Sequence, residues 1–141
     1  VFEHENILLK AIFTPGHAAG HMMFELSEWA KVIAIFSWDA LFQWWVWHTR
    51  GGSNEDLYNS IQKFQKYDGS VMIYSWHDYL KNNSDFWKKY TPENMEAIEN
   101  ILEIAWESKY FTNLLQERSY NPFLTVGREE FIKLRELRNN F

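Results

Sequence analysis

The 141-residue chain is 46% hydrophobic and 23% charged, and its 14 Lys and Arg against 19 Asp and Glu give a net charge of -5. This length and composition are enough to bury a core, which excludes intrinsic disorder. The basic residues are scattered rather than gathered in a stripe, which argues against nucleic acid as a partner. The absence of Cys excludes disulfides and thiol catalysis.

Membrane insertion is not expected. The longest apolar stretch, residues 32–47, is interrupted by Ser37, Asp39 and Gln43, and it is shorter than the roughly 20 residues that span a bilayer. The chain also carries no recognisable signal peptide. We therefore expect a cytoplasmic protein with no membrane partner.

The first half of the chain contains short β-branched or aromatic runs separated by Pro, Gly and charged residues, a pattern typical of strands. The predicted strands cover residues 7–13, 21–26, 32–36 and 71–74. Before the last of them, Ser53 and Asp56 have the spacing of a helix N-terminal cap. The apolar residues Leu57, Ile61 and Phe64 then recur on one helical face, so a helix is predicted there.

The second half has helical periodicity. Thr91-Pro92 predicts a helix start with Pro at the first helical position. Its apolar stripe would be formed by Met95, Ile98, Leu102 and Ala105. A final helix is predicted around Phe131, Leu134 and Leu137. Strands followed by helices indicate an α/β fold.

Three potential metal ligands each follow a strand-like run. His17 ends the segment TPGH, Asp39 lies within FSWDALF, and His77 lies within YSWHDY. Imidazole nitrogen and carboxylate oxygen atoms are donors that zinc, iron and manganese accept, so convergence of the three would make a metal site. Taken singly, each is more often a turn or capping residue. Their spacing leaves the question of convergence open.

The sequence around these residues resembles the second half of the metallo-β-lactamase fold. Within that fold it is most similar to the hydroxyacylglutathione hydrolases (glyoxalase II) and the persulfide dioxygenases. The similarity lies in four ordered segments: TPGHAAGHMMFEL, FSWDALF, YSWHDYLKNN and ERSYNPFL. The resemblance implies an α/β structure in which residues 1–80 form half of an αβ/βα sandwich and residues 81–141 form a helical substrate-binding extension.

The resemblance also implies a two-metal site. His17 would complete the imidazole set of the first metal, Asp39 would bridge both metals, and His77 would bind the second. Zinc is the expected metal, with iron or manganese as alternatives. The implied reaction is metal-assisted hydrolysis of a glutathione thioester, with Asp39 as the catalytic residue.

The resemblance further assigns three substrate-binding residues. Tyr79 would contact the glutathione backbone, although a tyrosine of the core is the ordinary alternative. Arg128 and Lys133 would face glutathione carboxylates, although solvated surface charges are the ordinary alternative. Two other functions stay open. One is a mononuclear iron persulfide dioxygenase, in which His17 and Asp39 but not His77 bind the metal. The other is a non-catalytic fragment or aromatic-rich binding module.

The chain departs from the family in lacking its leading His-x-His-x-Asp-His motif, which supplies most of the remaining metal ligands. The chain also begins at Val1 rather than at an initiator Met. We therefore expect a C-terminal portion whose partner is a missing N-terminal half of the same fold. The portion alone is expected to be inactive, because three ligands do not enclose two cations.

A second departure concerns tryptophan. The family pattern has glycine where this chain has Trp38, Trp44, Trp45, Trp47 and Trp76, and the chain has 8 Trp against 6 Gly. Glycine serves where the backbone needs a positive φ or a close approach. We hypothesise that the gene uses UGA as a glycine codon and that these codons were read as tryptophan. The alternative is a true aromatic platform for stacking sugars or bases.

Overall fold

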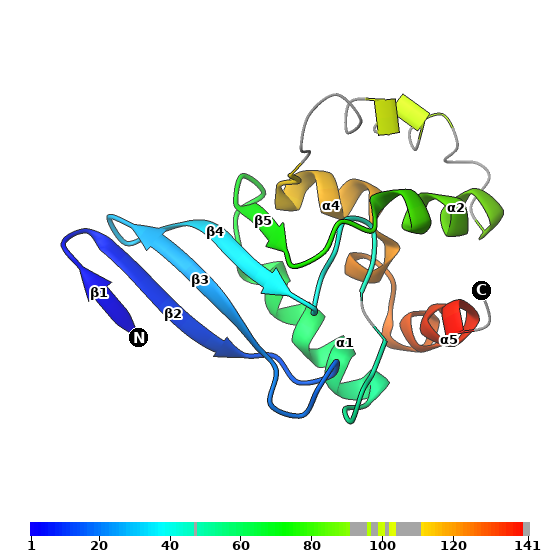
Figure 1. Cartoon of the computed structure of the whole chain (residues 1–141), viewed down its shortest axis with the longest axis horizontal. Coiled ribbons are helices and arrows are strands. Elements are labelled where there is room, and N and C mark those ends of the chain that lie inside the picture. Colours follow the sequence, from blue (N-terminus) through cyan, green and yellow to red (C-terminus); the bar gives the residue numbers. More distant parts are fainter. Residues whose placement is uncertain (47, 91–95, 97–98, 101, 104–110, 140–141) are drawn as a thin grey trace.

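The computed structural model describes residues 1–46, 48–90, 96, 99–100, 102–103 and 111–139. Its sheet has five strands in the order β1-β2-β3-β4-β5, and the helices gather beyond β5 and behind the sheet (Figure 1). The predicted α/β class is confirmed. Within the described ranges, no helix combines the length and the apolar character of a membrane-spanning segment.

The first four strands form an antiparallel meander, and the fifth pairs with the fourth in parallel. Their bounds are β1 Phe2–His4, β2 Ile7–Phe13, β3 Met22–Glu28, β4 Lys31–Trp38 and β5 Met72–Ser75. The parallel pairing sets Trp38 opposite Ser75. The residues that follow β4 and β5 therefore emerge at the same edge of the sheet.

The helices among the described residues are α1 Asn54–Gln62, α2 Leu80–Tyr90, α4 Leu114–Tyr120 and α5 Arg128–Asn139, with short 3-10 turns η1 Lys63–Lys66 and η3 Pro122–Leu124. The predicted cap of α1 is confirmed, because the Ser53 hydroxyl accepts a hydrogen bond from the Asp56 backbone N–H at 3.0 Å. Asn113 and Gln116 form a reciprocal capping box at the start of α4.

All four predicted strands and the first and last predicted helices are present. The strand β1 was not predicted, since it is only three residues long. The bounds of α2 and α4 were not predicted either, although the resemblance implied helices beyond residue 80. The helix predicted from Thr91-Pro92 falls largely outside the described residues. The division at residue 80 stays a prediction.

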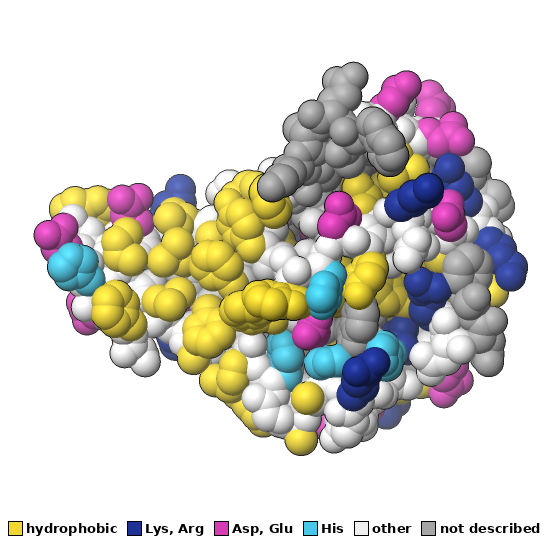
Figure 2. Space-filling view, viewed as in Figure 1, with side chains coloured by type: hydrophobic (Ala, Val, Ile, Leu, Met, Phe, Trp, Pro, Cys, Tyr) yellow, Lys and Arg dark blue, Asp and Glu magenta, His cyan; other side chains and the backbone are white. Residues whose placement is uncertain are grey.

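The two faces of the sheet differ. One face carries Met23, Ile35 and Ile73 into a core shared with α1, η1 and α5, through Leu57, Phe64 and Phe131 among others. On the other face, hydrophobic side chains gather over the strands and no described helix covers them (Figures 1 and 2). There a hollow of about 380 Å³ is lined by Leu9, Phe24, Phe36 and Trp38.

Candidate active site

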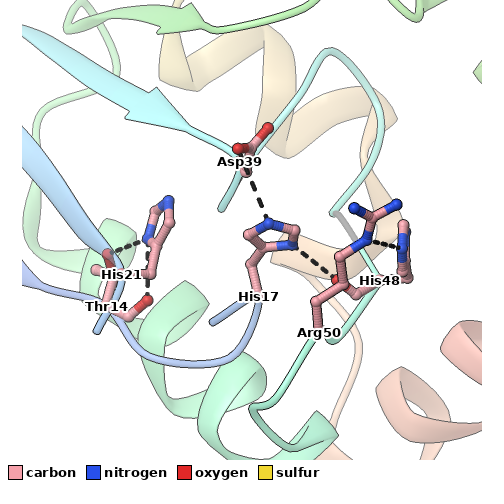
Figure 3. Close-up of polar contacts among 6 residues, drawn as sticks. All are labelled: Thr14, His17, His21, Asp39, His48 and Arg50. Carbon is pink, nitrogen blue, oxygen red and sulfur yellow. Dashed lines mark hydrogen bonds and ion pairs between the residues drawn. The ribbon is translucent and has the colours of Figure 1, made fainter. Parts of the chain in front are cut away.

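The loop between β2 and β3 brings the first predicted metal ligand to the sheet edge. The Thr14 backbone N–H donates to the His21 carbonyl at 2.9 Å and closes the loop. Gly16 has a φ of +140°, and a Cβ there would collide with Leu57 of α1, so glycine lets the loop lie directly on the helix. His17 follows immediately and points away from α1 toward the end of β4 (Figure 3).

His17 and Asp39 face one another, with Nε2 of the imidazole 3.9 Å from Oδ2 of the carboxylate. The other ring nitrogen, Nδ1, lies 2.9 Å from the His48 carbonyl oxygen (Figure 3). A carbonyl can only accept, so Nδ1 is the donor in this contact and Nε2 is the ring nitrogen turned toward Asp39. This arrangement of one nitrogen on a backbone carbonyl is typical of metal-binding histidines.

The Asp39 carboxylate is only partly satisfied. Its Oδ1 atom is buried and has no hydrogen-bond partner among the described residues. A buried carboxylate oxygen without a partner is costly, which makes it a candidate for a ligand contact. The structure thus brings His17 and Asp39 together, and their role as metal ligands stays a prediction.

His77 lies elsewhere along the same sheet edge. It follows β5, and its ring is 6.4 Å from that of Phe42 and 5.3 Å from that of Tyr79, measured between centroids. Within the described residues, no group of three His, Asp or Glu side chains is arranged to hold one metal ion. The assignment of His77 as a ligand therefore stays a prediction.

Two further histidines surround His17. The ring of His21 lies 6.1 Å from that of His17, and its Nδ1 contacts Thr14 (Figure 3). Arg50 donates from Nε to Nε2 of His48 at 3.0 Å. Burial is the main cause that lowers the pKa of both His21 and His48, so both rings favour the neutral form.

A polar cavity of about 400 Å³ adjoins His48. It is lined by Trp45, His48, Tyr79, Asn82, Asn83, Arg135, Arg138 and Asn139. Arg135 is 1% exposed, and its Nε and Nη1 atoms have no hydrogen-bond partner among the described residues. Burial, and then the charge of Arg138, lowers the pKa of Arg135 to about 10. The guanidinium remains a cation at neutral pH, so the cavity is suited to an anion.

The predicted substrate residues are only partly at this cavity. Tyr79 lines it. Arg128 instead pairs with Glu55 at the exposed start of α5, and Lys133 lies 3.5 Å from Glu130 on the surface of the same helix. Arg135 and Arg138 were missed, although their helical register with Phe131 and Leu134 could have indicated that α5 turns two arginines toward the core.

The tryptophan positions also have a structural signature. Among non-glycine residues in the described part, positive φ occurs at Glu5, Trp29, Ala30, Trp38 and Trp44. Trp38 (φ 49°) and Trp44 (φ 62°) are two of the positions where the family pattern has glycine. A left-handed conformation costs an L-residue other than glycine about 1–2 kcal/mol. Trp45 and Trp76 lack this signature, and Trp47 lies outside the described residues.

Comparison with solved structures identifies the fold. The chain superposes on ETHE1 from Myxococcus xanthus with a TM-score of 0.64 at 20% identity, covering 96% of this chain and 48% of that one. It matches a metallo-beta-lactamase from Staphylococcus aureus subsp. aureus COL with a TM-score of 0.62 at 19% identity, covering 92% of this chain and 34% of that one. The chain has part of the metallo-β-lactamase fold.

Sequence comparison relates the chain to one group of proteins that have the metallo-β-lactamase fold. It is 35% identical over 152 aligned residues to the hydroxyacylglutathione hydrolase of Francisella philomiragia and 33% identical to that of Francisella tularensis subsp. novicida. Each alignment covers 94% of this chain and 59% of the relative. The chain is thus a homologue of these hydrolases and spans somewhat over half their length. No protein-family model matches it.

Proposed function

We propose that the chain forms part of a metal-dependent thioesterase that hydrolyses a glutathione thioester. The observation that carries the proposal is the position of the His17–Asp39 pair beside the cavity that Arg135 and Arg138 line, which we call the cationic cavity. The two are linked directly, because His48 lines the cavity and its carbonyl binds Nδ1 of His17. The homology to hydroxyacylglutathione hydrolases supports the same assignment.

The residues present fit one side of a metal centre. His17 offers the imidazole nitrogen Nε2, which is turned toward Asp39, and Asp39 offers a buried oxygen that lacks a partner among the described residues. His77 would join them from the end of β5, and the remaining ligands would come from outside this chain. Zinc is the proposed metal, with iron or manganese as alternatives, and when bound it would supply a Lewis acid and a hydroxide at neutral pH.

The cavity would hold the glutathione part of the substrate. A buried guanidinium with two partnerless nitrogen atoms is suited to a carboxylate, which it can bind through paired hydrogen bonds. Arg138 adds a second positive charge, and Tyr79 adds a phenol at the rim. Most lining residues lie beyond residue 80, which agrees with a substrate-binding role for that part of the chain.

The uncovered sheet face would receive the rest of the fold. A solvent-facing surface built from Leu9, Phe24, Phe36 and Trp38 is unusually apolar for a monomer. The hydroxyacylglutathione hydrolases extend well beyond the part that this chain matches. We propose that the corresponding N-terminal half packs on this face and supplies the missing ligands.

Hydrolysis of a hydroxyacylglutathione by the protein joined to an N-terminal half of a homologous hydrolase tests the proposal. We expect metal-dependent activity, and we expect Arg135→Ala to raise KM by about 10- to 100-fold, the effect of losing a charged hydrogen bond. Lys10→Ala is the control, since Lys10 is an exposed cation on β2 and does not line the cavity, and it should leave KM unchanged. Absence of hydrolysis in a folded, metal-loaded protein would refute the proposal.

A mononuclear iron persulfide dioxygenase is the second candidate. It is favoured by one observation: His17 and Asp39 are within mutual reach, whereas no third ligand among the described residues joins them. Metal analysis of the complete protein separates the two candidates. One iron per chain with no thioester hydrolysis favours the dioxygenase, and two zinc ions favour the hydrolase.

A further inference from the structure

The loop that follows Asp39 is buried although it is not a helix or strand. Its residues 40–46 are all buried. We call residues 42–45 the buried turn, because Phe42 and Trp45 exchange two backbone hydrogen bonds there, at 2.8 and 3.1 Å. A buried turn must find partners for its remaining polar backbone groups, since an unsatisfied one costs about 1–3 kcal/mol.

Side chains from distant helices provide those partners. Asn83 of α2 donates to the Gln43 carbonyl at 2.9 Å, and the Trp87 indole donates to the Trp44 carbonyl at 2.8 Å. Asn121, the C-terminal cap of α4, donates to the Phe42 carbonyl at 3.4 Å. Each of these contacts satisfies a carbonyl. The turn also has a backbone donor to satisfy.

Glu117 of α4 satisfies that donor. Its Oε2 accepts from the Trp44 backbone N–H at 3.0 Å and from the Asn121 side-chain amide at 3.0 Å. The carboxylate is 0% exposed. Trp44 is also the residue of the turn with positive φ, so Glu117 binds the turn at its most strained position.

The two ends of the buried turn lead to the two halves of the proposed site. Asp39 lies three residues before Phe42, and Trp45 forms part of the wall of the cationic cavity. We infer that Glu117 is a positioning residue, which fixes the buried turn and thereby sets Asp39 and the cavity wall relative to one another. The effect of this role on the site rests on the proposed function. The contact between Glu117 and the buried turn does not depend on that function.

Amide hydrogen exchange tests the contact without any ligand. We expect Glu117→Gln to speed exchange at Trp44 by about 10-fold and Glu117→Ala by about 100-fold, because Gln keeps an acceptor oxygen and Ala does not. Exchange at Ile35 of β4 reports global stability and should change less than exchange at Trp44. Glu25→Gln is the matched control, since Glu25 is also a buried carboxylate bound to a side chain, the Tyr67 hydroxyl at 2.6 Å; it should leave Trp44 unchanged.

Binding of S-methylglutathione to the protein joined to a homologous N-terminal half tests the consequence. We expect Glu117→Gln to weaken the Kd at least 10-fold and Glu25→Gln to leave it unchanged. Equal acceleration of exchange at Trp44 and Ile35, or a loosened turn with an unaltered Kd, would overturn the positioning role. If the unmutated protein binds no S-methylglutathione, the proposed function fails, and the exchange data still decide whether Glu117 holds the turn. Should Glu117→Ala not fold, Asn121→Ala replaces it, because Asn121 binds both Glu117 and Phe42.

Discussion

Trp38 and Trp76 pack against one another with ring centroids 4.5 Å apart, at the ends of the two parallel strands that lead to Asp39 and His77. Trp38 adopts a left-handed backbone, and Trp76 is 59% exposed. Two indoles therefore stand at the rim of the candidate metal centre, on positions where the family pattern has glycine. The backbone conformation offers a way to decide whether tryptophan is the residue this fold requires there.

Comparison of Gly with Ala at each position isolates the backbone effect, because both substitutions remove the whole indole. At Trp38 and Trp44 we expect the Gly variant to be more stable than the Ala variant by about 1–2 kcal/mol, the cost of a left-handed L-residue. At Trp45 and Trp76, which lack positive φ, we expect Ala to equal or exceed Gly in stability. Urea denaturation measures the difference, and a Gly variant less stable than Ala at Trp38 or Trp44 would contradict the glycine requirement.

Trp29 allows the cost of a left-handed backbone to be measured at the surface, where no packing is lost. It is 74% exposed and forms the two-residue turn between β3 and β4 with Ala30, at φ values of 50° and 62°. Hairpin turns with two positive φ values favour Asn and Gly. We expect Trp29→Gly to raise the melting temperature by a few degrees, about 1 kcal/mol, because the substitution relieves strain without opening a cavity. Exposed Trp76→Gly is the control and should bring no gain.

Whether the gene encodes tryptophan or glycine at these positions can be tested directly. The UGA hypothesis predicts UGA codons at positions 38, 44, 45, 47 and 76, and mass spectrometry of the protein from its own host should then detect glycine at these positions. UGG codons would instead support a true aromatic platform. Trp76 is the position that best fits such a platform, since it is 59% exposed and its ring packs on that of Trp38.

The sequence predicted strand positions well because alternation and Gly-Pro punctuation are local signals. The family resemblance placed His17, Asp39 and His77 at one metal centre, and the structure brings the first two within 3.9 Å. Arg135 was missed, although the helical register of Arg135 with Phe131 and Leu134 places it on the buried face of α5. The partners of Glu117 were beyond reach, since Trp44 and Glu117 are separated by 73 residues and only tertiary packing joins them.

The buried carboxyl of Glu117 should make the free energy of unfolding depend on pH. Burial, opposed by hydrogen bonds from Asn121 and the Trp44 backbone, raises the pKa of Glu117 from its ordinary 4.5 to about 7. Folding therefore favours the protonated carboxyl, and its stabilising contribution is full below pH 4.5, declines as pH rises and is lost above pH 7. We expect this decline to amount to roughly 1–3 kcal/mol. Denaturation curves from pH 4 to 8 should show it, and Glu117→Gln should remove it.

The metal ligands can be tested by cobalt or zinc titration of the protein joined to a homologous N-terminal half. We expect His17→Ala and Asp39→Asn each to weaken metal binding by at least about 100-fold, because each removes a direct donor. His4→Ala is the control, since His4 lies on the exposed edge strand β1. The response of His77→Ala then separates the two candidate functions. Loss of one of two bound metals would support a dinuclear hydrolase, and unchanged binding of a single metal would support the mononuclear dioxygenase. Full metal affinity in the His17→Ala variant would exclude the site altogether.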